Sequence, residues 1–314
     1  MKRFIVRILL FMILPIPLLY GLNYIVDKGL QKSNYIYYAE WNDLFAGKIN
    51  ADLLICGSSR ALQDISPAIL DTSLGLNTYN LGMDGTHFSI QYDRVKMYLL
   101  YNKAPKYIVQ TMDFTSFAEQ NSLDNQLQFM PYLSNSVVIE YTAKYRDHYS
   151  WPERYFPLFK YNNQWPIIEE GVKSYLGHGM PPIKTKGYFA QNKKWDYTFD
   201  KYIQRVPYPV GVHVAGYSLN RFYDYLECCN KKGIKVIIVF PPVYYEFLHY
   251  CKNKDYILGI FRNCQAKYGT TFLDYSNDEL SRSRDNFYNS QHLNKGGAET
   301  FSRKLANDLK PLLR

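Results

Sequence analysis

The chain has 314 residues, a formal net charge of +9 and 31 tyrosines, and 47% of its residues are hydrophobic. This composition is typical of a globular protein and excludes a disordered chain. The positive charge suits an anionic membrane surface or an acidic glycan. Nucleic acid is the weakest partner class, because the sequence has neither a nucleic-acid-binding motif nor a dense run of Lys and Arg.

The N-terminus has the pattern of a membrane anchor. Three basic residues lie within the first seven positions, and residues 8–26 then carry no charge. Nineteen residues at about 1.5 Å each approach the ~30 Å hydrocarbon thickness of a bilayer. The basic start predicts a cytoplasmic N-terminus and an extracytoplasmic remainder. No small-x-small cleavage site follows, which favours an uncleaved anchor over a signal peptide. We therefore expect a cytoplasmic tip and transmembrane helix over 1–27 and a stalk over 28–49.

The chain from residue 50 alternates between strand and helix patterns, which predicts an α/β domain over 50–314. Strand patterns are short, apolar and rich in β-branched residues, and helical patterns separate them. This alternation predicts a parallel sheet with helices on both faces. The expected strands are "DLLICG", "NTYNLG", "KYIVQTMDF", "KVIIVFPP" and "TTFLDYS".

An aromatic-rich stretch at about 120–215 interrupts this alternation. It contains Trp-Pro, Phe-Pro and Met-Pro-Pro turns and little regular periodicity. Because the strand and helix patterns resume afterwards, we expect an insertion or cap rather than a separate domain. Its aromatic residues fit either a core or a sugar-binding platform.

Polar residues follow the ends of the predicted strands, where open parallel sheets form their sites. Ser58 and Ser59 follow the first strand, Gly82 the second and Asp113 the third, and His292 precedes the last helix. A serine nucleophile needs a base and N–H donors for the developing oxyanion. Ser59 could equally be a helix N-cap, and His292 a surface or capping residue.

Three sequence blocks resemble the SGNH, or GDSL-like, esterase superfamily: "GSSR" at 57–60, "NLGMDG" at 80–85 and "NSQHLNKGGAETFS" at 289–302. The last block is most similar to the membrane-anchored branch that includes the D-alanyl transfer protein of teichoic acid operons and alginate O-acetylation proteins. The resemblance covers about 50–118 and 217–312. It implies a three-layer α/β/α, flavodoxin-like fold, with Ser59 as nucleophile, His292 as base, and the N–H groups of Ser59 and Gly82 as the oxyanion hole.

Two positions depart from the pattern of this superfamily. Asn289 stands where the last block has Asp, and an Asn cannot stabilise the imidazolium by charge. This predicts a Ser–His dyad, a substitute carboxylate such as Asp285, or a disabled site. Asp113 stands where a third oxyanion donor is expected, and we expect it to hold a helix cap, Arg60 or a substrate hydroxyl. Arg60 would bind an anionic group of the substrate or form an ion pair.

The resemblance implies acyl-ester chemistry on a cell-surface or secreted polysaccharide, by transfer or hydrolysis. It also implies a multi-spanning membrane protein as acyl donor, and no metal or nucleotide cofactor. An alternative from a different class is a non-catalytic polysaccharide-binding or assembly subunit that retains the fold. Asn289 is the feature that favours this alternative.

Overall fold

The structure is a computed structural model that describes residues 3–4, 11 and 14–313. It divides into two compact units. One, the helical unit, joins Met1–Asp43 to Asn121–Ile183, and the other, the sheet unit, joins Leu44–Gln120 to Lys184–Arg314.

The sheet unit is an α/β fold around a five-stranded parallel sheet with the order β2-β1-β3-β4-β5. Neighbouring strands pair in parallel throughout, as the alternation of strand and helix patterns predicts. The strand order reverses between β1 and β3, and open sheets of this type form their sites at such a reversal, outside the carboxyl ends of the strands. The strands are β1 (Leu53–Cys56), β2 (Thr78–Asn80), β3 (Tyr107–Thr111), β4 (Lys235–Phe240) and β5 (Thr271–Asp274).

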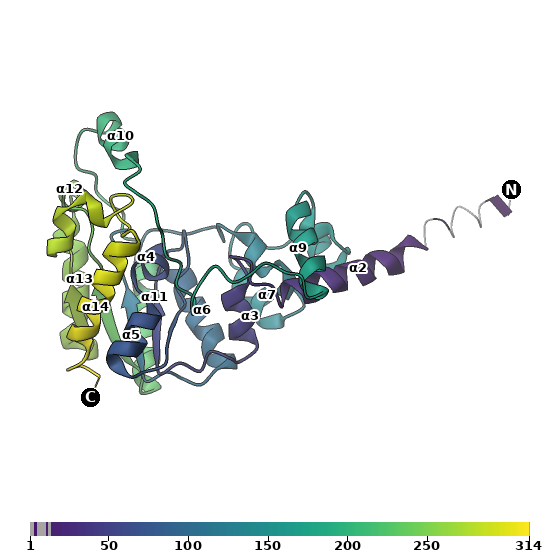
Figure 1. The fold of residues 1–314 in the computed structure, drawn as a ribbon, viewed down its shortest axis with the longest axis horizontal. Helices are drawn as coiled ribbons and strands as arrows, with labels where there is room; N and C mark the ends of the chain where they lie inside the picture. Colours follow the sequence, from purple (N-terminus) through teal and green to yellow (C-terminus); the bar gives the residue numbers. More distant parts are fainter. Residues whose placement is uncertain (1–2, 5–10, 12–13, 314) are drawn as a thin grey trace. The chain divides into compact units, whose positions relative to one another are not determined.

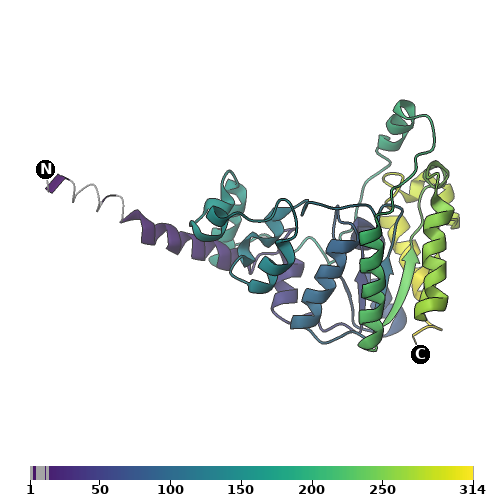
Figure 2. The same cartoon turned by 180° about the vertical axis from the view of Figure 1, so that it is seen from behind.

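Helices cover both faces of this sheet. Helices α4, α5 and α14 pack together on one face, and α6, α11 and α13 lie on the other (Figures 1 and 2). The α helices of the unit are α4 (Ser59–Asp64), α5 (Pro67–Leu74), α6 (Phe88–Tyr101), α10 (Thr198–Arg205), α11 (Gly216–Lys231), α12 (Tyr245–Tyr250), α13 (Lys254–Tyr268) and α14 (Lys295–Leu309). Two 3-10 turns, η3 (Glu279–Arg282) and η4 (Arg284–Asn286), precede α14.

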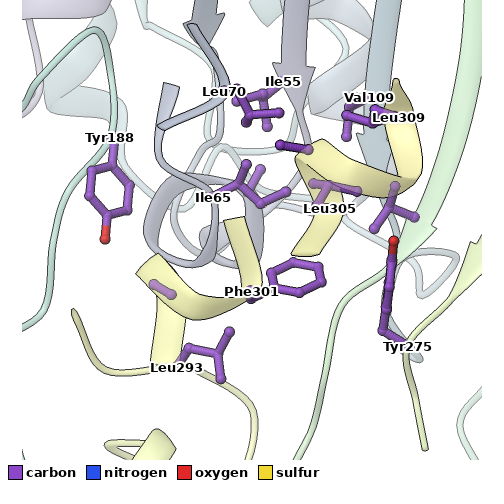
Figure 3. Close-up of a cluster of buried hydrophobic side chains, with 14 of the residues drawn as sticks. Ile55, Ile65, Leu70, Val109, Tyr188, Tyr275, Leu293, Phe301, Leu305 and Leu309 are labelled. Carbon is purple, nitrogen blue, oxygen red and sulfur yellow. The ribbon is translucent and has the colours of Figure 1, made fainter. Parts of the chain in front are cut away.

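Alternation along the strands divides the core between the two faces. Leu53 and Ile55 of β1 belong to the cluster under α14, which Phe301 and Leu305 complete (Figure 3). Leu54, which is also fully buried, is absent from that cluster, because successive side chains of a strand point to opposite faces. Both faces are therefore apolar, which explains why the strands read as continuous apolar runs.

The helical unit contains the first helix that the structure describes in full. Helix α2 (Pro15–Leu30) packs along α9 (Trp165–Tyr175). The remaining elements are α3 (Ala39–Phe45), which ends at the boundary between the units, η1 (Gln126–Tyr132), α7 (Ser136–Thr142), α8 (Trp151–Tyr155) and η2 (Phe159–Tyr161).

This division changes two boundaries that we expected from the sequence. Residues 28–43, part of the segment 28–49 that we expected to form a stalk, fall within the compact helical unit. The aromatic stretch at 120–215 is divided, because its first part joins the N-terminal residues and 184–215 joins the sheet unit. Contacts between segments distant in sequence produce both differences.

The expected anchor over 8–26 lies partly outside the described residues. Residues 8–10 and 12–13 are not described, and α2 begins at Pro15. Among the helices that the structure does describe, none combines the length and the apolar character needed to cross a membrane.

Candidate active site

Ser59 lies where β1 turns into α4. Gly57 has φ 149°, and a Cβ there would overlap the side chain of Thr111, so only glycine fits this turn. Ser58 is the N-cap of α4, and its hydroxyl donates to Asp113 at 2.9 Å. The two serines therefore have different roles: Ser58 holds the turn, and Ser59 is half-buried at the start of the helix.

His292 meets Ser59 although 233 positions separate them in the sequence. The Ser59 Oγ lies 2.7 Å from the His292 Nε2, which is hydrogen-bond distance. The loop between β5 and α14 carries His292 to the carboxyl edge of the sheet. The structure thus brings together the nucleophile and base that the sequence predicts.

Asn289 determines which nitrogen of His292 carries the proton. Its Oδ1 lies 2.9 Å from the His292 Nδ1 and also accepts the backbone N–H groups of Gln291 and His292, both at 3.0 Å. A backbone N–H can only donate, so the amide atom facing these groups is the oxygen. The Nδ1 must then donate to that oxygen, which leaves the Nε2 as an acceptor for the Ser59 hydroxyl.

This arrangement answers the main objection to an Asn at this position. In the serine-protease triad an Asp-to-Asn change lowers kcat about 10⁴-fold through the wrong histidine tautomer. Here two backbone donors exclude the amide orientation that would produce that tautomer. Asp285, the predicted substitute carboxylate, instead pairs with Ser283 in a 3-10 turn, so that prediction is wrong.

The surroundings of His292 keep its imidazole neutral. Burial, followed by the positive charge of Arg60, lowers the pKa of His292 to about 4. The carboxylates of Asp113 and Asp196 act in the opposite direction, but neither accepts a hydrogen bond from the ring. At neutral pH the ring is therefore in its base form, although a base of such low pKa is weak.

The N–H of Gly82, a predicted oxyanion donor, is engaged within the protein. It donates to the Oδ1 of Asn80 at 2.8 Å. A Cβ at Gly82 would overlap the backbone of Leu62 in α4, so glycine is needed here for packing. The Ser59 N–H, the other predicted donor, has no acceptor within the described part of the chain.

Arg60 and Asp113, the predicted substrate-binding residues, are both bonded within the protein, Arg60 in an ion pair with Asp64 and Asp113 to the N-cap Ser58. Arg60 is 2% exposed, and its Nη2 donates to the carbonyl of Pro242 at 2.6 Å. Asp113 is 8% exposed and accepts hydrogen bonds from Ser58 and from the N–H and hydroxyl of Thr115. Both charges are therefore satisfied by the protein itself.

Asp64 positions the histidine loop, a role that sequence reasoning missed. Its fully buried carboxyl accepts the backbone N–H of Leu293 at 3.0 Å and lies 3.5 Å from the Arg60 Nε. Burial raises the pKa of Asp64 to about 7 despite Arg60. The spacing of Arg60 and Asp64, one helical turn apart, was the available signal.

Tyr288 is a second residue that the sequence did not reveal. Its ring stacks on that of His292, with centroids 5.4 Å and planes 14° apart. The Tyr288 hydroxyl donates to Gln63, and the Lys193 ammonium lies 5.4 Å from the Tyr288 ring centroid. Tyr288 therefore packs against one face of the imidazole, and the Asn289 amide bonds to its edge at the Nδ1.

Two cavities lie beside the histidine loop in the sheet unit. The first, which we call the aromatic cavity, has a volume of about 500 Å³ and includes Asn289 in its wall. The second, the basic cavity, has a volume of about 890 Å³. Aromatic side chains of the first are Phe114, Phe199, Tyr202, Phe247 and Tyr250, and the second is lined by Lys193, Lys194, Trp195, Arg284, Asp285 and Lys295, among others.

The basic cavity differs from the buried part of the site in its free charge. Within the described residues, Lys194 and Lys295 have no carboxylate partner. Arg284 pairs with Asp200 at 2.9 Å and lies over the ring of Trp195 at 4.7 Å. The cavity therefore offers cationic groups beside an indole ring. No cluster of metal-ligating side chains occurs among the residues described.

Comparison with known proteins adds little to this geometry. No protein-family model matches the sequence, and no curated protein matches it. A crystal structure from Bacteroides fragilis, described as a "putative acylhydrolase", is similar over 83% of this chain and 88% of its own, with 11% sequence identity and a TM-score of 0.37.

Proposed function

We propose that this chain is a membrane-anchored, extracytoplasmic O-acyltransferase or esterase of SGNH type. Its substrates would be acyl esters of a cell-surface or secreted polysaccharide. One observation carries the proposal: the Ser59 Oγ, the two imidazole nitrogens of His292 and the Asn289 Oδ1 form a continuous hydrogen-bonded chain, with distances of 2.7 and 2.9 Å.

The reaction follows from the protonation states of these three groups. The Ser59 oxygen attacks the ester carbonyl while its proton moves to the His292 Nε2. The tetrahedral intermediate collapses, the ester C–O bond breaks, and the His292 proton passes to the leaving alcohol. An acceptor hydroxyl, or water, then attacks the acyl-serine while His292 removes its proton. The bond between the acyl carbon and the Ser59 Oγ breaks, and His292 returns the proton to Ser59. Asn289 keeps the Nδ1 proton in place through both steps.

The basic cavity supports a polysaccharide substrate. Aromatic faces and cationic side chains suit an acidic sugar polymer, and this cavity has an indole ring beside unpaired lysines. The aromatic cavity, next to Asn289, has room for a second part of the same substrate.

The anchor and the donor partner rest on the sequence. The basic start and the uncharged residues 8–26 support insertion into a membrane with the remainder of the chain outside the cytoplasm. The proposed acyl donor is a multi-spanning membrane protein, on the SGNH resemblance alone.

A non-catalytic binding or assembly subunit is the second candidate. Two observations favour it: Asn289 brings no charge to stabilise the imidazolium, and the Gly82 N–H is engaged by Asn80. In this case the basic cavity would bind the polysaccharide without turnover.

Covalent labelling with a fluorophosphonate, followed by intact mass and peptide mapping, separates the two candidates. The enzyme predicts labelling at Ser59 in the wild type and none in Ser59→Ala or His292→Ala. Ser58→Ala is the matched control, because Ser58 is adjacent but bonds to Asp113, and it should still be labelled.

The outcomes lead in different directions. Ser59 labelling that requires His292 supports the enzyme, and release of acetate from glycans then identifies its substrate. A folded wild-type protein that takes no label contradicts the enzyme and favours the binding subunit, which polysaccharide binding at the basic cavity would test.

A further inference from the structure

Exposed aromatic side chains gather on the helical unit. Trp151, Tyr155, Phe156, Phe159 and Trp165 are 47–75% exposed, and we call this group the aromatic belt. Trp151 contacts the rings of Tyr155 and Phe156, at centroid distances of 5.6 and 5.1 Å. Large apolar side chains clustered at the surface commonly mark a binding surface.

Four members of the aromatic belt belong to a segment that is bound to α2. The Tyr20 hydroxyl donates to the carbonyl of Tyr155 at 3.0 Å, and the Leu158 N–H donates to the Oδ1 of Asn23 at 3.0 Å. The segment therefore runs in the same direction as α2, and these rings lie beside residues 20–23 of the helix.

An ion pair attaches the same segment to α2 one helical turn further along. Lys160 lies 2.7 Å from Asp27, which also accepts the Tyr161 hydroxyl at 2.5 Å. Because Lys160 is buried, Asp27 is partly buried and both are bonded, the segment is held at one height along the helix.

Helix α9 brings the fifth member, Trp165, to the same height. A Cβ at Gly171 would overlap Val26, and one at Gly29 would overlap Gly171 and approach Tyr175. The two helices therefore run in the same direction and are very close. Trp165 precedes Gly171 by six positions, or about 9 Å toward the N-terminal end of α2.

The polarity of α2 changes at the height of the aromatic belt. Before Tyr20 the exposed large side chains are apolar, and from Asn23 onward amide and charged side chains appear. The former are Leu14, just before α2, and Ile16, Leu18 and Leu19; the latter are Asn23, Asp27 and Lys28, followed by Gln31 and Lys32 just beyond the end of the helix.

We propose that the aromatic belt lies in the headgroup region of a lipid bilayer, so that the helical unit rests on the membrane surface. Trp and Tyr rings favour this region because one part of the ring is apolar and the other forms hydrogen bonds. The belt is continuous with the apolar end of α2 and marks its change of polarity. The inference rests on the proposed anchor but not on the proposed chemistry.

The test uses the full chain in vesicles of phosphatidylcholine and phosphatidylglycerol, some with brominated acyl chains. Trp41→Phe/Trp195→Phe keeps Trp151 and Trp165. The control Trp151→Phe/Trp165→Phe/Trp195→Phe keeps Trp41, which lies in the same unit at 2% exposure. We expect brominated lipid to quench the first variant and not the control, with stronger quenching by bromine near the carbonyl than at the chain end.

Flotation and acrylamide quenching make the other outcomes decisive. A chain that does not float with vesicles overturns the inference together with the anchor. If the chain floats and its belt tryptophans are quenched by acrylamide but not by brominated lipid, the belt lies in water. If neither agent quenches them, the belt is covered by protein. Either result overturns the bilayer contact alone. If Trp41→Phe does not fold, Trp195→Phe alone still reports lipid quenching of the belt.

Discussion

The two units bury charged side chains for different purposes. In the helical unit, Asp27 pairs with Lys160 and accepts the Tyr161 hydroxyl, which attaches one segment of the unit to α2. In the sheet unit, Asp64 and Arg60 lie behind the loop that presents His292, and the histidine and its serine stay half-buried. A buried charge network therefore indicates a functional site only where it supports a group that solvent or substrate can reach.

The largest effect is expected from removing Asn289, the last residue in the chain of hydrogen bonds from Ser59 through His292. Asn289→Ala removes the acceptor that fixes the His292 tautomer, so fluorophosphonate labelling of Ser59 should slow by up to about 10⁴-fold, the size of the tautomer effect in serine proteases. Stopped reactions read by intact mass measure the rate. Ser290→Ala, whose hydroxyl has no part in the chain of hydrogen bonds, should label at the wild-type rate. Equal labelling rates for Asn289→Ala and Ser290→Ala would contradict a role of Asn289 in fixing the His292 tautomer.

The equivalent change in the helical unit should affect stability and not reactivity. Asp27→Ala leaves Lys160 buried without a partner, which costs about 3–5 kcal/mol in other proteins. Hydrogen exchange should show loss of protection in α9, while Ser59 labelling continues. Glu169→Ala, which breaks an exposed pair with Lys173, should leave protection unchanged. Lost labelling in a folded Asp27→Ala protein would contradict the separation of roles.

A negative charge placed next to His292 should change the pH dependence of Ser59 labelling. In Asn289→Asp the new carboxylate favours the imidazolium, so the pKa of His292 rises from about 4 toward or above its ordinary value of 6.5. Labelling requires the neutral ring and falls as pH drops through this pKa. The acid limb of the rate profile should therefore move to higher pH in the variant.

The control for this shift adds the same charge close to the same loop without touching the ring. Gly296→Asp places a carboxylate in the first turn of α14, where the added Cβ would meet only the Asn294 Oδ1 at 3.6 Å. Its acid limb should stay close to that of the wild type. An unchanged limb in Asn289→Asp would mean that another group controls His292.

The smallest expected effect concerns Gly82. Gly82→Ala drives a methyl group into the backbone of Leu62, and such overpacking costs about 1–3 kcal/mol. Chemical denaturation measures this loss, and labelling per folded molecule should persist. Gly296→Ala, near the start of α14, should not destabilise, because its Cβ would meet only the Asn294 Oδ1, at an ordinary contact distance of 3.6 Å. A Gly82→Ala protein as stable as the wild type would contradict this packing role.

The sheet was predictable because its signal is local. Each strand is buried on both faces and therefore reads as a short apolar run, and each is followed by a helical pattern. The pairing of Ser59 with His292 was predictable, since Ser59 follows the first strand and His292 precedes the last helix, and both reach the carboxyl edge of the sheet.

The other site residues were not predictable, because their roles depend on contacts across the fold. Arg60 and Asp113 look like substrate-binding charges in the sequence, yet both are buried and bonded within the protein. Asp64 and Tyr288 carry no motif, and only packing brings them to His292.

The sequence by itself determined the strand and helix alternation, the placement of Ser59 after a strand and of His292 before the last helix, and the apolar N-terminal segment. The tertiary structure decided three further points: the pairing of Met1–Asp43 with Asn121–Ile183, the contact of Asp64 with Leu293, and the contact of Gln63 with Tyr288. Each of the three is a contact that the hydrophobic periodicity of the sequence does not predict. The free energy that selects such contacts comes from burial and hydrogen bonding in three dimensions.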